Sequence, residues 1–89
     1  MSNVEWQIAF PTGDWVVTYR GIRIVIKRSW TGNPLEIGWY IGGKEVESIP
    51  LDCDEELAKR IGTEVVDQRI PVDEEWREAA KRDRESDLS

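Results

Sequence analysis

Residues 13–28, GDWVVTYRGIRIVIKR, are the most strongly patterned part of this 89-residue chain. β-branched and aromatic residues stand on both sides of Arg20-Gly21, which predicts two strands joined by a tight turn. A two-residue loop would place three pairs on one face of the sheet: Trp15 with Ile26, Val17 with Ile24, and Tyr19 with Ile22. Such a loop needs positive φ, which glycine adopts readily and arginine does not. A longer turn with a bulge at Gly21 is therefore an alternative.

The segment before this hairpin predicts another strand. Residues 4–10 alternate strictly, which is typical of a half-buried strand. The side chains expected on its apolar face are Val4, Trp6, Ile8 and Phe10. Pro11 would end the strand, because proline cannot donate to a β-ladder.

The segment after the hairpin predicts two more strands. Residues 29–34 have the composition of a loop, in which Trp30 is an unusual residue. Alternation returns from Leu35 to Ile41, and Gly42-Gly43 makes a turn into a short strand that would pair Trp39 with Val46. We therefore expect a four- to five-stranded antiparallel β-meander over residues 4–49.

A helix over residues 52–67 is expected to cover the apolar face of this sheet. Asp52 with Glu55 three residues later fits a capping box. The face turned to the sheet would comprise Leu57, Ala58, Ile61 and Val65. Gly62 lowers helix propensity, so the helix either passes through it or ends there.

A short charged helix over residues 73–84 is predicted next, capped by Asp73 after a connector at residues 69–72. Residues 85–89 have nothing to bury and are expected to be a disordered tail. Together these elements make one α+β domain over residues 1–84.

Composition argues against several classes of function. The chain has one cysteine, Cys53, and no histidine, which removes disulfides, thiolate zinc sites and Ser–His or Cys–His nucleophile pairs. The acids lack the spacing of a calcium loop. We expect no metal, no cofactor and no enzymatic activity. No apolar run approaches the roughly 20 residues of a membrane span, and no signal segment is present, so we expect a cytoplasmic protein.

The net charge of −6 is unevenly distributed. Residues 1–50 carry five cations and five acids, whereas residues 51–89 carry seven cations and thirteen acids. The acids form two clusters at the predicted helix starts: Asp52, Asp54, Glu55 and Glu56, and then Asp73, Glu74 and Glu75. Acids at helix starts complement the helix dipole. Two such clusters would also form a continuous negative surface that imitates nucleic-acid phosphates or occupies a basic groove of a partner protein.

Two tryptophans are candidate contact residues for such a partner. Trp30 lies in a predicted loop and Trp76 lies on a mostly charged helix. Tryptophan is enriched among the residues that dominate binding energy. The alternative is that each ring folds back over an edge of the small core.

These features predict a small acidic, non-enzymatic protein-binding module. We expect an inhibitor or regulator of a nucleic-acid-handling enzyme, of the kind that phages and mobile elements direct against host defence. One alternative is a nucleic-acid-binding sheet that uses the outer face of the hairpin, with Arg20, Arg23, Lys27 and Arg28. Another is a subunit that dimerises through exposed tryptophans.

Overall fold

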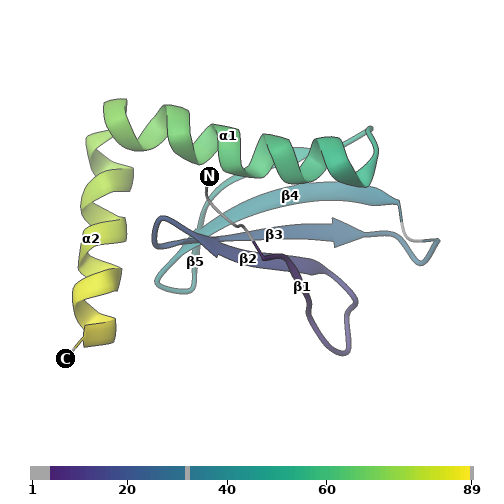
Figure 1. Cartoon of the computed structure of the whole chain (residues 1–89), viewed down its shortest axis with the longest axis horizontal. Helices are drawn as coiled ribbons and strands as arrows, with labels where there is room; N and C mark the ends of the chain where they lie inside the picture. The colour runs from purple at the N-terminus through teal and green to yellow at the C-terminus, as the bar shows by residue number, and fades with distance from the viewer. Residues whose placement is uncertain (1–4, 32, 89) are drawn as a thin grey trace.

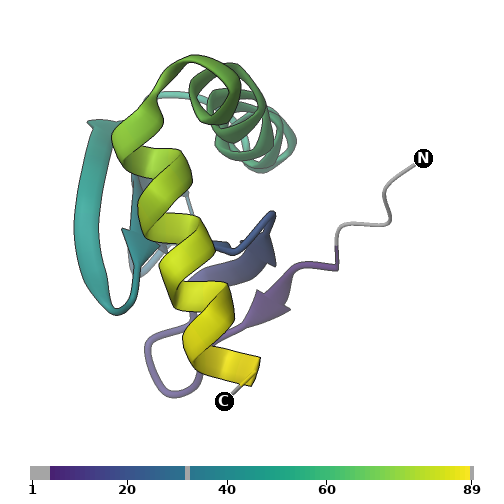
Figure 2. The same ribbon diagram turned by 90° about the vertical axis from the view of Figure 1, so that its left-hand side faces the viewer.

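The computed structural model describes residues 5–31 and 33–88. It confirms the α+β fold, with five antiparallel strands in sequence order followed by two helices (Figure 1). The elements are β1 (Gln7–Ile8), β2 (Trp15–Tyr19), β3 (Ile22–Arg28), β4 (Pro34–Ile41), β5 (Lys44–Pro50), α1 (Glu55–Val72) and α2 (Glu74–Leu88). Helix α1 lies along one face of the sheet, and α2 turns away from it to cross the ends of the strands (Figure 2).

The central hairpin has the predicted register. Trp15 pairs with Ile26, Val17 with Ile24 and Tyr19 with Ile22. The two-residue turn is present, with φ of 53° at Arg20 and 83° at Gly21. Arg20 therefore adopts the left-handed conformation that favours glycine, and its guanidinium is held by a 3.0 Å bond to the Asp67 carboxylate on α1. The bulged alternative is wrong.

The pairing predicted between Trp39 and Val46 is wrong by one residue. Gly42-Gly43 makes the expected turn, and Ile41 pairs with Lys44. The register then shifts, so that Trp39 lies opposite Glu47. A bulge on β5 absorbs Val46, which local turn chemistry does not reveal.

The first strand is much shorter than predicted, since β1 contains only Gln7 and Ile8. Phe10 is 95% exposed rather than turned to the core, and Ile8 is 57% exposed. The chain turns at Ala9, whose N–H donates to the Asp14 carbonyl at 2.7 Å, so Phe10 lies in the loop. Trp6 does pack on the core. Val4 lies outside the described residues.

Helix α1 is unbroken and differs from the prediction at both ends. Asp54, rather than Asp52, is the N-cap, because its carboxylate accepts the Leu57 N–H at 2.8 Å. The helix continues through the expected connector to Val72, and Ile70 is buried there against the core. The gain from burying that side chain accounts for the additional turn.

The buried face of α1 is Ala58, Gly62, Val66 and Ile70. Leu57 is therefore wrongly predicted to face the sheet, and it is 42% exposed. A Cβ on Gly62 would lie 2.9 Å from Ile24 and 3.0 Å from Ile37, so glycine allows the helix backbone to touch the sheet. At this contact Trp39, fully buried, donates its indole N–H to the Gly62 carbonyl at 3.0 Å.

Helix α2 begins where predicted, with the Asp73 carboxylate accepting the Trp76 N–H at 3.3 Å. It extends to Leu88, beyond the predicted end near residue 84 and into the segment expected to be a disordered tail. Trp76 is 5% exposed, and its ring centroid lies 6.3 Å from that of Trp39. Burial removes Trp76 from the candidate contact residues, since it completes the core instead.

We expect Gly62→Ala to destabilise the protein even though alanine is the better helix former. The added methyl group would overpack the contact with Ile24 and Ile37, at a cost that exceeds the propensity gain by about 1–2 kcal/mol. Chemical denaturation gives the free energy of unfolding. The control is Gln68→Ala, on the exposed side of the same helix, which we expect to change it by less than about 0.5 kcal/mol. A Gly62→Ala variant more stable than wild type would contradict the close-approach argument.

Candidate functional site

One end of the sheet gathers two loops and the start of α1, and we call it the loop end (Figure 1, right). It comprises the β1–β2 loop, the β3–β4 loop and the chain from Leu51 into α1. Arg28 joins the two loops, because its Nε donates to the Gly13 carbonyl at 2.7 Å. The Leu51 N–H donates to the Leu35 carbonyl at 2.8 Å, which holds the entry to α1 at the same end.

The most exposed aromatic side chains of the described residues lie at this end. Trp30 in the β3–β4 loop is 97% exposed, and Phe10 in the β1–β2 loop is 95% exposed. Leu35 and Ile8, at the adjoining strand ends, are more than half exposed. Isolated surface hydrophobic residues are ordinary, but several that gather at one end of a small domain indicate an interaction surface.

Both loops are closed by their own hydrogen bonds. In the β3–β4 loop the Ser29 N–H donates to the Asn33 carbonyl at 2.8 Å. In the β1–β2 loop the Gly13 N–H returns to the Ala9 carbonyl at 2.7 Å. Residues held by such bonds lose less conformational entropy when neighbouring side chains bind a partner.

Trp15 contacts two cations at the loop end. The Arg28 guanidinium carbon lies 5.3 Å from its ring centroid, and the Lys59 ammonium of α1 lies 3.8 Å from it. Lys59 also pairs with Glu55 at 3.4 Å. These cation–π contacts tie the first turns of α1 to the base of the loops. Arg28, predicted as part of a nucleic-acid surface, is engaged in this support.

The first acidic cluster lies at the loop end, as the position of the α1 start requires. Asp54 caps the helix and Glu55 pairs with Lys59. Asp52 and Glu56 are exposed and form no ion pair within residues 5–31 and 33–88. Two exposed carboxylates therefore lie at the same end of the sheet as the exposed aromatic loops.

The second acidic cluster lies far from the first. Asp73, Glu74 and Glu75 lie past the far end of the 18-residue α1, about 27 Å away along its axis. Lys59, Arg60 and Arg69 stand on the helix between them. Asp73 is also engaged, since it caps α2 and pairs with Arg69 at 3.3 Å. The two clusters therefore lie at opposite ends of α1, with Glu64 and Asp67 also on the helix between them, and a continuous negative surface across both stays a prediction.

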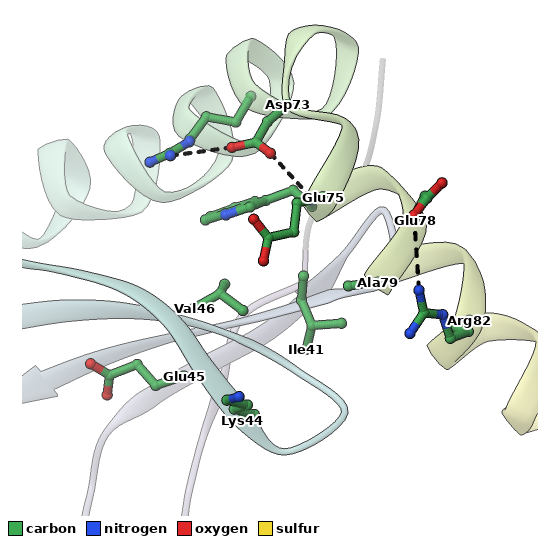
Figure 3. Close-up of a pocket in the computed structure, with 11 residues that line it drawn as sticks. Ile41, Lys44, Glu45, Val46, Asp73, Glu75, Glu78, Ala79 and Arg82 are labelled. Atoms are coloured by element: carbon green, nitrogen blue, oxygen red, sulfur yellow. Dashed lines mark hydrogen bonds and ion pairs between the residues drawn. The ribbon is translucent and has the colours of Figure 1, made fainter.

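A groove of about 620 Å³ separates β5 from α2 (Figure 3). Its lining is mostly charged and includes the apolar side chains of Ile41, Val46 and Trp76. Arg69 crosses it to pair with Glu47 and Asp73, and its guanidinium carbon lies 4.9 Å from the Trp76 ring centroid. The hydrogen bond to Glu47 is the largest influence that raises the pKa of Arg69. Arg82 and Glu78 form a further pair at 3.9 Å. The pair with Glu47 joins α1 to β5, the pair with Asp73 joins the end of α1 to the cap of α2, and the pair of Arg82 with Glu78 lies within α2.

The four cations of the predicted nucleic-acid surface are mostly engaged within the protein. Arg20 pairs with Asp67 at 3.0 Å, and Lys27 pairs with Glu36 at 3.6 Å. Arg28 belongs to the loop end, since the strand register shifts between Lys27 and Arg28. Arg23 is exposed and forms no ion pair with another described residue. The hairpin therefore presents separated cations rather than one basic face.

The outer face of the sheet carries a small titratable cluster around Tyr40. Its hydroxyl donates to the Glu45 carboxylate at 2.9 Å. Burial raises the pKa of Tyr40, and the bond to Glu45 adds to this. Attraction to the ionised Tyr40, and then to Glu36, raises the pKa of Lys27. Both groups therefore hold their protons to higher pH in the folded chain than in the unfolded one.

Sequence reasoning placed Trp30 at the surface and missed Phe10. The apolar residues that alternate before Phe10 predicted a strand, but Phe10 directly precedes Pro11 and a Thr-Gly turn. Pro11 was the signal that Phe10 lies in a loop, because a proline restricts the backbone of the residue before it and ends the β-ladder. Loop residues presented by a fixed scaffold are frequent binding positions.

No group of three or more cysteine, aspartate or glutamate side chains in the described part of the chain is placed to hold a metal ion. None of the described helices is long and apolar enough to cross a membrane. No family model, curated protein or solved structure matches the chain.

Arg28→Met should loosen the β1–β2 loop, because it removes the donor to the Gly13 carbonyl while keeping an apolar stem on Trp15. We expect hydrogen exchange of the Ala9 and Gly13 amides to accelerate about tenfold, which corresponds to about 1.4 kcal/mol for a charge-assisted hydrogen bond. Arg23→Met, on the same strand but without such a bond, is the control. Equal exchange rates in the two variants would contradict the bracing role.

Alkaline pH should lower the stability of the folded protein through Tyr40 and Lys27. Their pKa values are raised on folding, so their stabilising contribution is complete below about pH 10 and is lost as the pH rises through the folded-state values. Denaturant unfolding between pH 9 and 12 measures this slope. Tyr40→Phe should flatten it, whereas Thr18→Ala on the same face should leave it unchanged. If Tyr40→Phe leaves the dependence of the unfolding free energy on pH unchanged, groups other than Tyr40 cause the loss of stability.

Proposed function

We propose that this protein is a small non-enzymatic binding module, an inhibitor or regulator that docks its loop end onto a partner protein. The partner has a basic surface, such as that of a nucleic-acid-handling enzyme of the host-defence type, with an apolar site that receives the aromatic rings. The module acts in a reducing cytoplasm, since its single cysteine needs no partner there. A phage or mobile-element origin is consistent with this role.

The observation that carries the proposal is the exposure of Trp30 and Phe10 in closed loops at one end of the sheet. Each ring gains a large apolar contact area when a partner covers it, and each has few torsions to immobilise. In protein interfaces a few such residues supply most of the binding free energy. Leu35 and Ile8 would extend the apolar contact at its margin.

The charge of the loop end supports a partner with a basic surface. Asp52 and Glu56 lie at the loop end and form no ion pair with a described residue. Rim carboxylates of this kind attract a basic surface and speed association, while contributing less to the lifetime of the complex. The net charge of −6 acts in the same direction over longer distance. Of the seven acids predicted to contact the partner, we therefore assign this role to those at the start of α1.

The proposal is tested by comparing three forms of the protein as bait and then in purified complexes. Wild type should capture an enzyme from its host and inhibit it stoichiometrically. Phe10→Ala/Trp30→Ala should fold normally and weaken the affinity at least about 30-fold, since two hot-spot rings are lost. Asp52→Asn/Glu56→Gln should mainly slow association and reduce its salt dependence.

Glu74→Gln/Glu75→Gln is the matched control, because it removes the same number of charges at the far end of α1 and should bind as wild type. Several outcomes would contradict the proposal. One is an inhibitor complex that is insensitive to the aromatic pair. A second is tight heparin retention that Arg23→Glu/Lys27→Glu abolishes, which would favour the nucleic-acid alternative. A third is a concentration-dependent dimer that Trp30→Ala disrupts, which would favour self-association.

A further inference from the structure

Three cations that are distant in the sequence converge where α2 passes the β2–β3 turn. Arg20 comes from that turn, and Arg77 and Lys81 stand one turn apart on α2. They line a cavity of about 220 Å³ whose remaining walls are Ile70 and Ala80. We call this set the basic corner. It lies at the opposite end of the sheet from the exposed aromatic loops, and nothing in the proposed function uses it (Figure 1, left).

The fold brings these side chains together through a close backbone contact. A Cβ on Gly21 would lie 3.5 Å from the Ala80 carbonyl oxygen, so the turn lies directly against α2. The Asp73 carboxylate caps the first turn of α2 by accepting the Trp76 N–H at 3.3 Å. The corner thus joins a tight turn to a helix, and the contact between Gly21 and Ala80 sets how close the backbones that carry its cations lie.

The charges of the corner are only partly compensated within the protein. Arg20 donates from Nη1 to the Asp67 carboxylate, and its other guanidinium N–H groups can donate to a ligand. Arg77 and Lys81 are exposed and form no ion pair with any other described residue. Like charges four residues apart on a helix repel one another. An anion between them would relieve that repulsion and gain charge-assisted hydrogen bonds from two arginines.

We propose that the basic corner is a binding site for a phosphate group carried by a small ligand. Arginine matches tetrahedral oxyanions with its planar fork of donors, and lysine adds a compact positive charge. Ile70 and Ala80 give an apolar wall against which the rest of such a ligand would pack. A nucleic-acid strand fits less well, because its neighbouring phosphates would extend past three cations onto a chain of net charge −6.

The test is a titration of the isotope-labelled full chain with inorganic pyrophosphate at constant ionic strength, followed by amide NMR shifts. We expect saturable shifts confined to residues near the β2–β3 turn and the first three turns of α2. Arg77→Gln/Lys81→Gln should weaken binding at least about tenfold, because each lost charge-assisted bond is worth about that factor. Pyrophosphate should also raise the thermal midpoint of wild type and not that of this variant.

The matched control is Lys44→Gln/Arg60→Gln, which removes two exposed cations without ion pairs from β5 and α1 and changes the net charge equally. It should bind pyrophosphate as wild type does. Equal weakening in both double variants would overturn the site, since it would show general charge attraction. Shifts that never saturate would overturn it as well. A short single-stranded DNA that binds more tightly than pyrophosphate, and is lost with Arg77 and Lys81, would replace the small ligand by nucleic acid.

Discussion

The fold depends on the contact between Trp39 and Gly62. A tryptophan at the centre of the sheet donates its indole N–H to the backbone of α1, and the missing side chain at residue 62 lets that backbone come close enough to accept. A buried indole N–H without an acceptor would destabilise the folded state. The bond therefore fixes the distance of α1 from the sheet and the rotation of α1 about its own axis. Ala58, Val66 and Ile70 then lie on the buried face.

This rotation of α1 about its axis determines where α2 lies. It therefore also determines which residues lie at each end of the molecule. Ile70 is buried near the end of α1, Asp73 starts α2, and Trp76 packs on the same Trp39 that anchors α1. Helix α2 is thereby held against the turn at Arg20-Gly21, which gathers cations. The start of α1 is held at the other end, beside the exposed aromatic loops. One core contact thus separates an aromatic, acidic end from a basic corner.

The parts that the sequence predicted well are those decided by nearest neighbours. The hairpin register followed from alternation and from a glycine in the turn, and the cap at Asp73 followed from its side chain. The bulge on β5 was missed, because alternation and the Gly42-Gly43 turn predict an unbroken register. Burial of Trp76 was one of two alternatives, since the sequence of the helix does not show whether the ring meets a partner or the distant Trp39. Within the candidate site, Trp30 was predicted as a contact residue, whereas Phe10 was assigned to the core.

The sequence by itself determined the α+β fold, the central hairpin and the excess of acids in the second half of the chain. These properties follow from side-chain periodicity, turn chemistry and counting. The tertiary structure alone decided which charges stand together. It separated the two acidic clusters by the length of α1 and dispersed the hairpin cations among Asp67, Glu36 and Gly13. It also joined Arg20 to Arg77 and Lys81, because a surface is made by the packing of distant elements and no local pattern records that packing.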